Sequence, residues 1–207
     1  MRLDPGRIEP WRPPALVIDP WTVLRLARYR RREDAPPAVW TATRAMAVRA
    51  GALAAPEARL RRVRIAGADG DRVQLAEGPA FSGRAVARHL AGTDDAVAFV
   101  LTLGPALEAE VAALGARDEP LDAYLLDLAG WAGLETAVRA LRQDLARVLP
   151  GSRLSHRLGP GHQDWPLEEQ AGLVALLDEP APVVRLSEHG VLVPLKSISG
   201  LFALRAA

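Results

Sequence analysis

Hydrophobic residues recur at intervals of three and four along much of the chain, which is the period of helices that bury one face. The longest such pattern covers residues 121–149 and ends at Pro150-Gly151. Shorter patterns begin after residues that favour helix starts and end at glycine or proline. They predict further helices from Asp19-Pro20 to about Arg32, over 38–50 with Gly51 as the stop, from a Ser82 cap to Leu90, from Gly104-Pro105 to Leu114, and over 167–177.

Strand patterns lie between these helices. Residues 61–76 alternate apolar and polar side chains around an Ala-Asp-Gly-Asp turn, which predicts a β-hairpin. Residues 96–102 form a nearly uncharged apolar run that is typical of a buried strand. Shorter extended segments are predicted at 183–186, 191–193 and 198–203.

Helices and strands are mixed without regular alternation, which favours an α+β fold over a doubly wound α/β fold. We expect a mainly antiparallel sheet flanked by helices, in a single domain over residues 19–207. Residues 1–18 are rich in proline, so we expect an extended N-terminal lead-in there.

Composition excludes several classes of function. Hydrophobic residues make up 49% and charged residues 25% of the 207, which is the balance of a globular protein. The formal net charge of +1 does not support a nucleic-acid partner. Cysteine is absent, which excludes disulfides, thiolate metal sites, iron–sulfur clusters and thiol catalysis. Lys196 is the only lysine, so any Schiff-base chemistry would rest on that residue.

The sequence contains neither a membrane-spanning pattern nor a secretory signal pattern, which bears on where the protein is found in the cell. No stretch approaches the ~18 uncharged apolar residues of a membrane helix. The first residues carry charges and prolines and no apolar secretory region. We therefore expect a cytoplasmic protein that does not bind a membrane.

The segment 157–166 has the most unusual composition. Two glycines and two prolines in ten residues restrict the backbone to a path that few other residues follow. Arg157, His162, Asp164 and Trp165 add charge, a titratable group and a stacking surface, which suits a small zwitterionic or carboxylate ligand. The alternative is a rigid surface turn in which Arg157 and Asp164 pair with each other.

The longest predicted helix contains Gly130 and Gly133 in its interior, where each glycine costs roughly 1 kcal/mol relative to alanine. Close approach of another element or of a ligand explains that cost. Asp127, Trp131 and Glu135 share a face with these glycines near one edge. The alternative is a helix crossing that needs small residues, with the two acidic side chains in solvent.

Common catalytic and metal-binding patterns are missing. No Gly-x-Ser-x-Gly motif accompanies the serines near residue 197, and no histidine spacing suits a metal ion. There is also no phosphate loop or dinucleotide fingerprint. The sequence therefore predicts no catalytic side chain and no metal ligand.

Four ordered segments together carry a resemblance to a known family. They are the Arg157–Pro166 loop, the helix Gln170–Leu177, Leu186-Ser187-Glu188, and the Pro-x-x-Ser-x-Ser-Gly stretch Pro194–Gly200. This set resembles the activation (reactivation) domain of cobalamin-dependent methionine synthase, most strongly over residues 121–203. The first 120 residues are similar, more loosely, to free-standing proteins of this family through Asp19-Pro20, Thr102-Leu103-Gly104 and Glu108.

The resemblance implies a function in cobalamin repair. In the family, the domain binds S-adenosylmethionine and docks on a cobalamin-binding methyltransferase. An electron from a flavodoxin-type donor reduces the oxidised cobalamin, and the methyl group of S-adenosylmethionine then remethylates it. This chain has no cobalamin-ligating Asp-x-His-x-x-Gly motif, so the cobalamin would be carried by a separate partner protein.

The same resemblance implies the site residues. Arg157 would bind the ligand carboxylate, and the backbone of Gly159, Pro160 and Gly161 would line the ligand. Two positions depart from the family pattern. His162 stands where the family has tyrosine, and Trp131 stands one turn before Glu135, where the family has an acidic residue. Either Glu135 substitutes for that acid, or Trp131 stacks on the cationic sulfonium.

Three hypotheses follow from these observations. The first is a stand-alone activation module that binds S-adenosylmethionine and supports reductive remethylation on a partner. The second is a non-catalytic module that docks on or chaperones a corrinoid protein and has lost the ligand. The third is an unrelated small-molecule enzyme that uses Asp164, His162 and Glu135.

Overall fold

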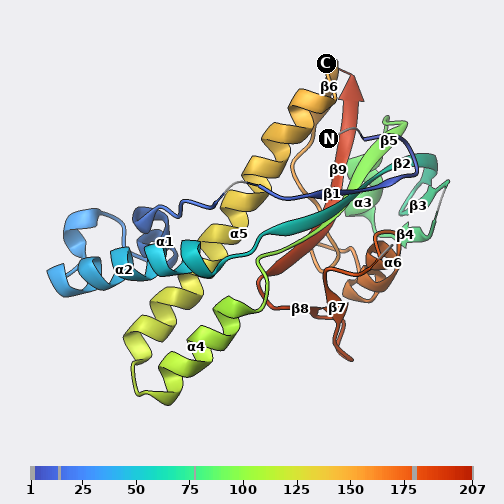
Figure 1. The fold of residues 1–207 in the computed structure, drawn as a ribbon. Coiled ribbons are helices and arrows are strands. Elements are labelled where there is room, and N and C mark those ends of the chain that lie inside the picture. The colour runs from blue at the N-terminus through green and yellow to red at the C-terminus, as the bar shows by residue number, and fades with distance from the viewer. Residues whose placement is uncertain (1–2, 14, 77, 179–180, 207) are drawn as a thin grey trace.

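The computed structural model describes residues 3–13, 15–76, 78–178 and 181–206, and its centre is a seven-stranded sheet (Figure 1). The strands of this sheet are β1 Ile8–Trp11, β2 Glu57–Asp69, β3 Arg72–Leu75, β4 Ala80–Ser82, β5 Asp95–Thr102, β6 Ser152–Leu154 and β9 Ser197–Ala206. They are ordered β4-β3-β2-β5-β9-β6, and β1 pairs with β2. Each strand pair is antiparallel. The predicted α+β class with a mainly antiparallel sheet is confirmed.

Helices cover both faces of this sheet. On one face the long helix α5 (Pro120–Val148) packs against α1 (Pro20–Leu26), α2 (Pro37–Leu53) and α4 (Ala106–Ala116). On the other face lie α3 (Arg84–Leu90) and α6 (Gln170–Ala175) (Figure 1). Strands β7 Arg185–Leu186 and β8 Leu192–Val193 form a separate small hairpin. Short 3-10 turns lie at η1 Arg32–Asp34 and η2 Leu167–Glu169.

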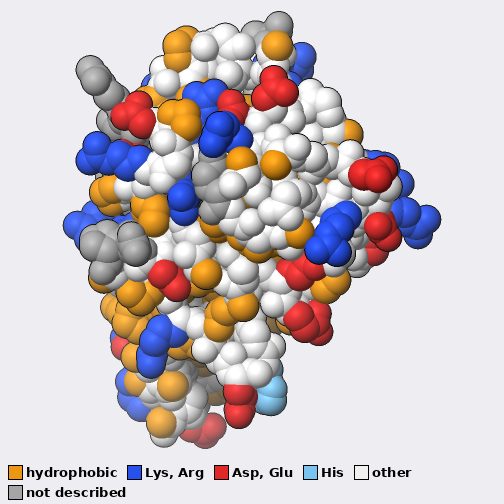
Figure 2. Space-filling view, turned by 90° about the vertical axis from the view of Figure 1, so that its right-hand side faces the viewer, with side chains coloured by type: hydrophobic (Ala, Val, Ile, Leu, Met, Phe, Trp, Pro, Cys, Tyr) orange, Lys and Arg blue, Asp and Glu red, His pale blue; other side chains and the backbone are white. Residues whose placement is uncertain are grey.

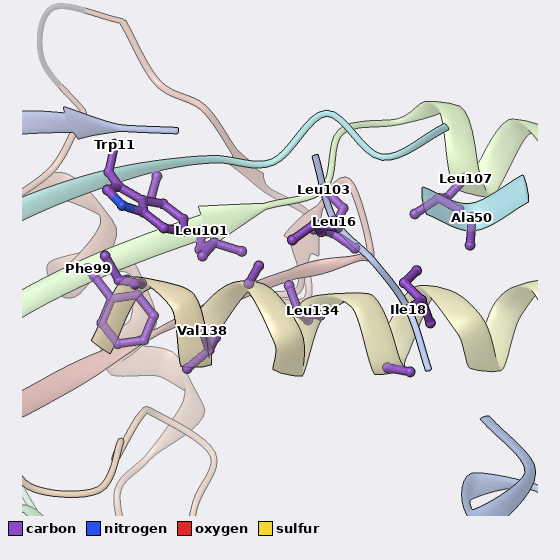
Figure 3. Packing of buried hydrophobic residues seen from close by; sticks show 14 of the residues in the cluster. Trp11, Leu16, Ile18, Ala50, Phe99, Leu101, Leu103, Leu107, Leu134 and Val138 are labelled. Carbon is purple, nitrogen blue, oxygen red and sulfur yellow. The ribbon is translucent and has the colours of Figure 1, made fainter. Parts of the chain in front are cut away.

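The sheet separates two hydrophobic cores, and β5 contributes to both. Its side chains alternate, so that Phe99 and Leu101 face α5 while Ala98 and Val100 face α3 and α6. Figure 3 shows Phe99 and Leu101 on the side of α5, near Leu134 and Val138. Burial on both faces explains why this strand is a continuous apolar run in the sequence.

Several predicted boundaries move because of tertiary contacts. Helix α1 ends at Leu26 instead of Arg32, and Arg28 beyond it takes a positive φ of 72°. Helix α2 continues through Gly51, where an added Cβ would lie 2.8 Å from the carbonyl oxygen of Leu16. Gly51 is therefore required by close packing and does not end the helix.

The predicted lead-in contributes to the sheet. Strand β1, within residues 1–18, pairs with β2 and brings the Trp11 side chain into the core, where its Nε1 donates to Asp144 Oδ2 at 2.9 Å. The segment thus packs on the sheet and on α5 over these residues.

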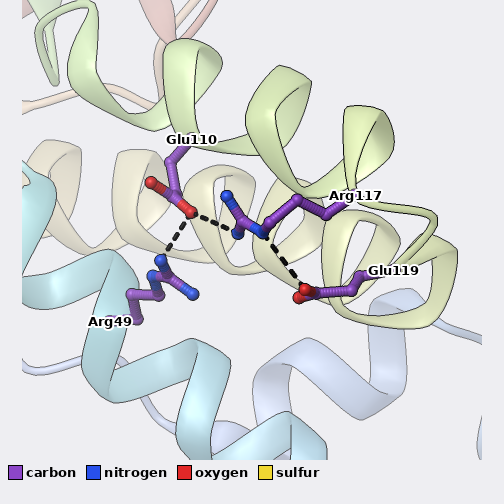
Figure 4. A network of polar contacts seen from close by, with 4 residues as sticks. All are labelled: Arg49, Glu110, Arg117 and Glu119. Atoms are coloured by element: carbon purple, nitrogen blue, oxygen red, sulfur yellow. Dashed lines mark hydrogen bonds and ion pairs between the residues drawn. The ribbon is translucent and has the colours of Figure 1, made fainter.

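Polar contacts join the helices on the α5 face. Glu110 of α4 accepts hydrogen bonds from Arg49 of α2 at 2.5 Å and from Arg117 at 3.1 Å, and Arg117 also reaches Glu119 (Figure 4). Figure 2 shows one face of the molecule, on which basic and acidic side chains are interspersed. Within the described ranges, no helix has the length and apolar character needed to cross a membrane.

Candidate functional site

The segment before the Gly/Pro loop is held against strand β9. The backbone of Leu158 pairs with Leu201 through two hydrogen bonds, at 3.1 and 2.7 Å. A Cβ added to Gly159 would lie 2.6 Å from the carbonyl oxygen of Ser199, and one added to Gly200 would lie 2.6 Å from that of Leu158. Both glycines are therefore required because two backbones approach closely.

The loop itself is rigid because its members bond to one another. The N–H of His162 donates to Gly159, the N–H of Gly161 donates to Trp165 at 2.9 Å, and the N–H of Trp165 donates back to His162. Gly161 takes a φ of +80°, which favours glycine. The His162 side chain is exposed at the rim of this loop.

Trp165 anchors the loop in the core and offers no stacking surface to a ligand. Its side chain is 1% exposed and meets Phe81 edge-on at 5.1 Å between ring centroids. Its Nε1 donates to Glu169 Oε2 at 2.9 Å, and Glu169 in turn accepts from Ser82. The interpretation of Trp165 as a ligand platform was wrong, because the indole is buried against Phe81 and its N–H is bonded to Glu169.

Asp164 caps helix α3. Its Oδ1 accepts from the N–H of Ala85 at 2.8 Å and its Oδ2 from the N–H of Arg84 at 3.0 Å. The Ala85 hydrogen bond, together with that of Arg84, lowers the pKa of the Asp164 carboxyl below its usual range. The predicted Ser82 cap and the Arg157–Asp164 pair are therefore both wrong, because Asp164 is committed to α3.

Arg157 lies on the opposite face of the sheet from α3 and is half-buried. Its Cγ is close to Gly200, where an added Cβ would be 3.0 Å away. Burial lowers the pKa of this guanidinium, while the carboxylate of Glu135 on α5 acts in the opposite direction. Among the described residues, no hydrogen bond or ion pair satisfies the guanidinium. A partly desolvated fork with free donors is suited to a carboxylate.

A cavity of about 610 Å³ begins at Glu135 and runs between α5 and β6. Its volume is that of a small-molecule site. Arg142 is fixed in its wall, because its Nη2 donates to the Leu154 carbonyl at 3.2 Å and its guanidinium lies 5.8 Å from the Phe202 ring. The lining is completed by Val138, Arg139, Gln143, Ala146, Ser152, Arg153 and Leu154.

A second cluster on α5 surrounds the only lysine. The Lys196 side chain is 4% exposed, its Nζ lies 2.6 Å from Asp127 Oδ1, and it is 4.6 Å from the centroid of the Trp131 ring. A Cβ on Gly130 would lie 2.8 Å from Lys196 Cε. The cost of Gly130 is therefore explained by close approach of another element, the Lys196 side chain before β9, and not by a helix crossing. Asp127 is paired with Lys196, whereas the helix-crossing interpretation had left it in solvent.

The backbone that carries Lys196 is also held from α4. Glu108 accepts hydrogen bonds from the N–H groups of Leu195 and Lys196, the latter at 3.2 Å. The composition of the sequence identified Lys196 as unusual, but only the fold brings it to Asp127, 69 positions away.

The structure thus brings some predicted site residues together and separates others. Arg157 lies within electrostatic range of Glu135, and Glu135 also lines the groove that the cavity forms between α5 and β6. Gly159 packs against the backbone of β9 and does not line that groove. Trp131 is one helical turn from Glu135, but its indole faces Lys196 and lines a different cavity of about 440 Å³. Asp164 binds α3 on the other face of the sheet, so it does not join Glu135 in a catalytic group. Within the described segments, no three acidic or histidine side chains form a metal site.

Comparisons with known proteins agree with this architecture. No protein-family model matches the sequence, and no curated relative is found by sequence similarity. The crystal structure of the MetH reactivation domain bound to AdoHcy matches with a TM-score of 0.71, over 98% of this chain and 78% of that chain, at 16% identity. At that identity the similarity establishes the fold. The chain has the fold of the MetH reactivation domain.

Proposed function

We propose that this protein binds a ligand of the S-adenosylmethionine type beside α5, between Arg157 and the groove that begins at Glu135. The observation that carries the proposal is the half-buried Arg157 fork beside Glu135, in a fold whose solved neighbour binds AdoHcy, which is S-adenosylhomocysteine. The cavity that begins at Glu135 is large enough for the adenosine part of such a ligand.

The chain's own residues would bind and orient the ligand. Arg157 would hold the carboxylate through two parallel hydrogen bonds, and Glu135 would face the ligand's positive charge. The backbone of Gly159, Pro160 and Gly161 would form one wall, with His162 at the rim. S-adenosylmethionine supplies an electrophilic methyl group when bound, and the protein contributes by positioning that group.

We further propose that the methyl acceptor is a cobalamin carried by a separate methyltransferase of the methionine synthase type. The chain has no cysteine to hold an iron–sulfur cluster, so the electron that precedes methylation would come from a separate donor, which we propose to be of the flavodoxin type. This protein would act on its partner by docking over the cobalamin.

One observation favours a second candidate, a non-catalytic module that docks on a corrinoid protein without the ligand. The indole face of Trp131 that would stack on a sulfonium lies against the Lys196 ammonium. A protein that kept the fold and lost the ligand would still present the same docking surface.

Titration calorimetry with S-adenosylmethionine and AdoHcy tests ligand binding. Arg157→Ala should weaken binding by on the order of 10- to 100-fold, as expected for a lost charge-assisted hydrogen-bond pair. Arg157→Lys keeps the charge without the fork and should give an intermediate loss. Arg44→Ala, at an exposed position of α2, is the matched control. If the unaltered protein binds neither S-adenosylmethionine nor AdoHcy, the proposed site is refuted.

A second experiment tests the partner. The protein is combined with a cobalamin-dependent methyltransferase in its inactive cob(II)alamin form, a flavodoxin-type donor and S-adenosylmethionine, and recovery of activity is followed. Recovery that is lost in Arg157→Ala supports the first function. Co-purification with the methyltransferase without ligand binding supports the second function. If the protein neither restores activity nor co-purifies with the methyltransferase, both functions are rejected.

A further inference from the structure

Two groups on α5 that could attract a positive charge, Asp127 and Trp131, contact the protein's own lysine and line a different cavity from the groove beside Glu135. Asp127 is paired with Lys196 at 2.6 Å, and the Trp131 ring lies 4.6 Å from the same ammonium. Carboxylates and aromatic faces are the features that stabilise a cationic ligand. In this structure both contact the Lys196 ammonium, which would compete with a sulfonium for them.

Lys196 is held firmly in that position. Its side chain is buried, Gly130 leaves the space that it fills, and Glu108 bonds the backbone of its own residue and of Leu195. Displacing the ammonium would leave the Asp127 carboxylate without its partner. A cationic ligand would therefore have to compete with an intramolecular contact.

The groove beside Glu135 is dominated by positive charge. Arg139, Arg142 and Arg153 line the cavity, and Arg157 lies within electrostatic range of Glu135 at its start. Arg139 and Arg153 are exposed and make no hydrogen bond or ion pair within the part of the chain that the structure describes. Four guanidinium groups thus accompany a single carboxylate.

From this charge distribution we infer that the site binds the neutral thioether AdoHcy more tightly than the sulfonium S-adenosylmethionine. The inference rests on the proposed function and adds the selectivity of the same site. The two ligands differ by one methyl group and one positive charge, so their shapes are nearly the same and electrostatics decides between them.

The consequence is regulation by the demethylated product. After methyl transfer, the thioether remains in the groove that favours it and hinders entry of the next sulfonium. The protein then responds to the ratio of the two ligands and not to the concentration of the methyl donor alone.

The expected preference is modest because several of these arginines are solvent-exposed. Each exposed guanidinium changes the binding constant of a nearby charge by a factor on the order of two. Together they predict about 5- to 10-fold tighter binding of AdoHcy at low ionic strength. The preference should shrink in 0.5 M sodium chloride, where the Debye length falls to roughly 4 Å.

The test is paired calorimetric titration of the whole chain with both ligands at low and high salt. Sinefungin, which carries an amine in place of the sulfonium, serves as a second cationic probe and should bind like S-adenosylmethionine. The double variant Arg139→Gln/Arg153→Gln should bring the affinity ratio towards one, and Arg44→Gln should leave it unchanged. Because both substituted arginines are exposed, these variants should fold.

The possible results separate the inference from the function on which it rests. Equal or tighter binding of S-adenosylmethionine overturns the selectivity and leaves the proposed function standing. An affinity ratio that does not change in the double variant also overturns it. Failure of both ligands to bind the unaltered protein rejects the proposed function itself, and the selectivity with it.

Discussion

Asp164 Oδ1 accepts a hydrogen bond at 2.8 Å from the backbone N–H of Ala85, 79 positions earlier in the chain. A residue in the Gly/Pro loop therefore caps a helix that lies far away in the sequence. This contact joins the candidate binding loop to α3.

Replacement of Asp164 should lower stability in a graded way. Asp164→Asn keeps one acceptor oxygen for the α3 N-terminus, whereas Asp164→Ala keeps none. We expect the midpoint of thermal unfolding to fall by a few degrees for alanine and by less for asparagine. Circular dichroism measures these unfolding midpoints. Equal midpoints for the unaltered protein and the two variants would show that the cap contributes nothing.

His89 should make the protein less stable in mild acid. Burial, reinforced by the neighbouring His156, lowers the pKa of His89 to about 4, against an ordinary value of 6.5. Between pH 6.5 and 4 the unfolded chain binds this proton and the folded protein does not, so stability falls as the pH decreases. The free energy of unfolding should drop by about 2 kcal/mol from pH 7 to pH 5 through this residue.

Urea unfolding at several pH values measures that effect. His89→Gln should flatten the pH dependence of the free energy of unfolding between pH 7 and pH 5, even where the substitution changes the stability at pH 7. His189→Gln, at an exposed position, is the control and should follow the unaltered protein. A slope that persists in His89→Gln would assign the pH dependence to other groups.

Two glycines in helices should respond oppositely to alanine. At Gly115 of α4 an added Cβ meets nothing within 4 Å, so Gly115→Ala should stabilise by up to ~1 kcal/mol. At Gly130 the Cβ would meet Lys196 Cε at 2.8 Å, so Gly130→Ala should destabilise by roughly 1–3 kcal/mol. Denaturant unfolding distinguishes the two, and a stabilised Gly130→Ala would show that Lys196 moves without cost.

The network around Glu110 should contribute a small, salt-dependent stability (Figure 4). Glu110→Gln removes the charge that Arg49 and Arg117 share, and should cost less than about 1 kcal/mol because the arginines are partly exposed. The difference from the unaltered protein should narrow in 0.5 M salt. A difference that is independent of salt would assign the loss to packing instead.

The local hydrophobic pattern predicted those elements in which the buried residues follow the period of a helix or the continuous apolar run of a buried strand. The run 96–102 is a strand buried on both faces, and the apolar spacing of 121–149 gives the helix α5. The turn near Gly70 also predicted the β2–β3 hairpin, although β2 begins earlier, at Glu57. In each case the signal lies within a few neighbouring residues.

Contacts between distant segments were not predictable in the same way. Trp165 was interpreted as a ligand surface and is a core residue, because Phe81 and Glu169 come to it through the fold. Asp164 was interpreted as a partner of Arg157 and instead caps α3. A Gly/Pro-rich loop has no period, so its side chains could not be assigned to a face from the sequence alone.

The burial of the only lysine gives this protein a chemical reporter of its native state. Apart from the α-amino group, an amine-reactive reagent finds its target solely at Lys196, whose side chain is 4% exposed. Covalent labelling there requires the segment around β9 to open, so the labelling rate measures how often that opening occurs. A ligand that stabilises the groove should slow labelling of Lys196. Mass spectrometry of the whole chain would count that label as one group in addition to the group on the α-amino nitrogen.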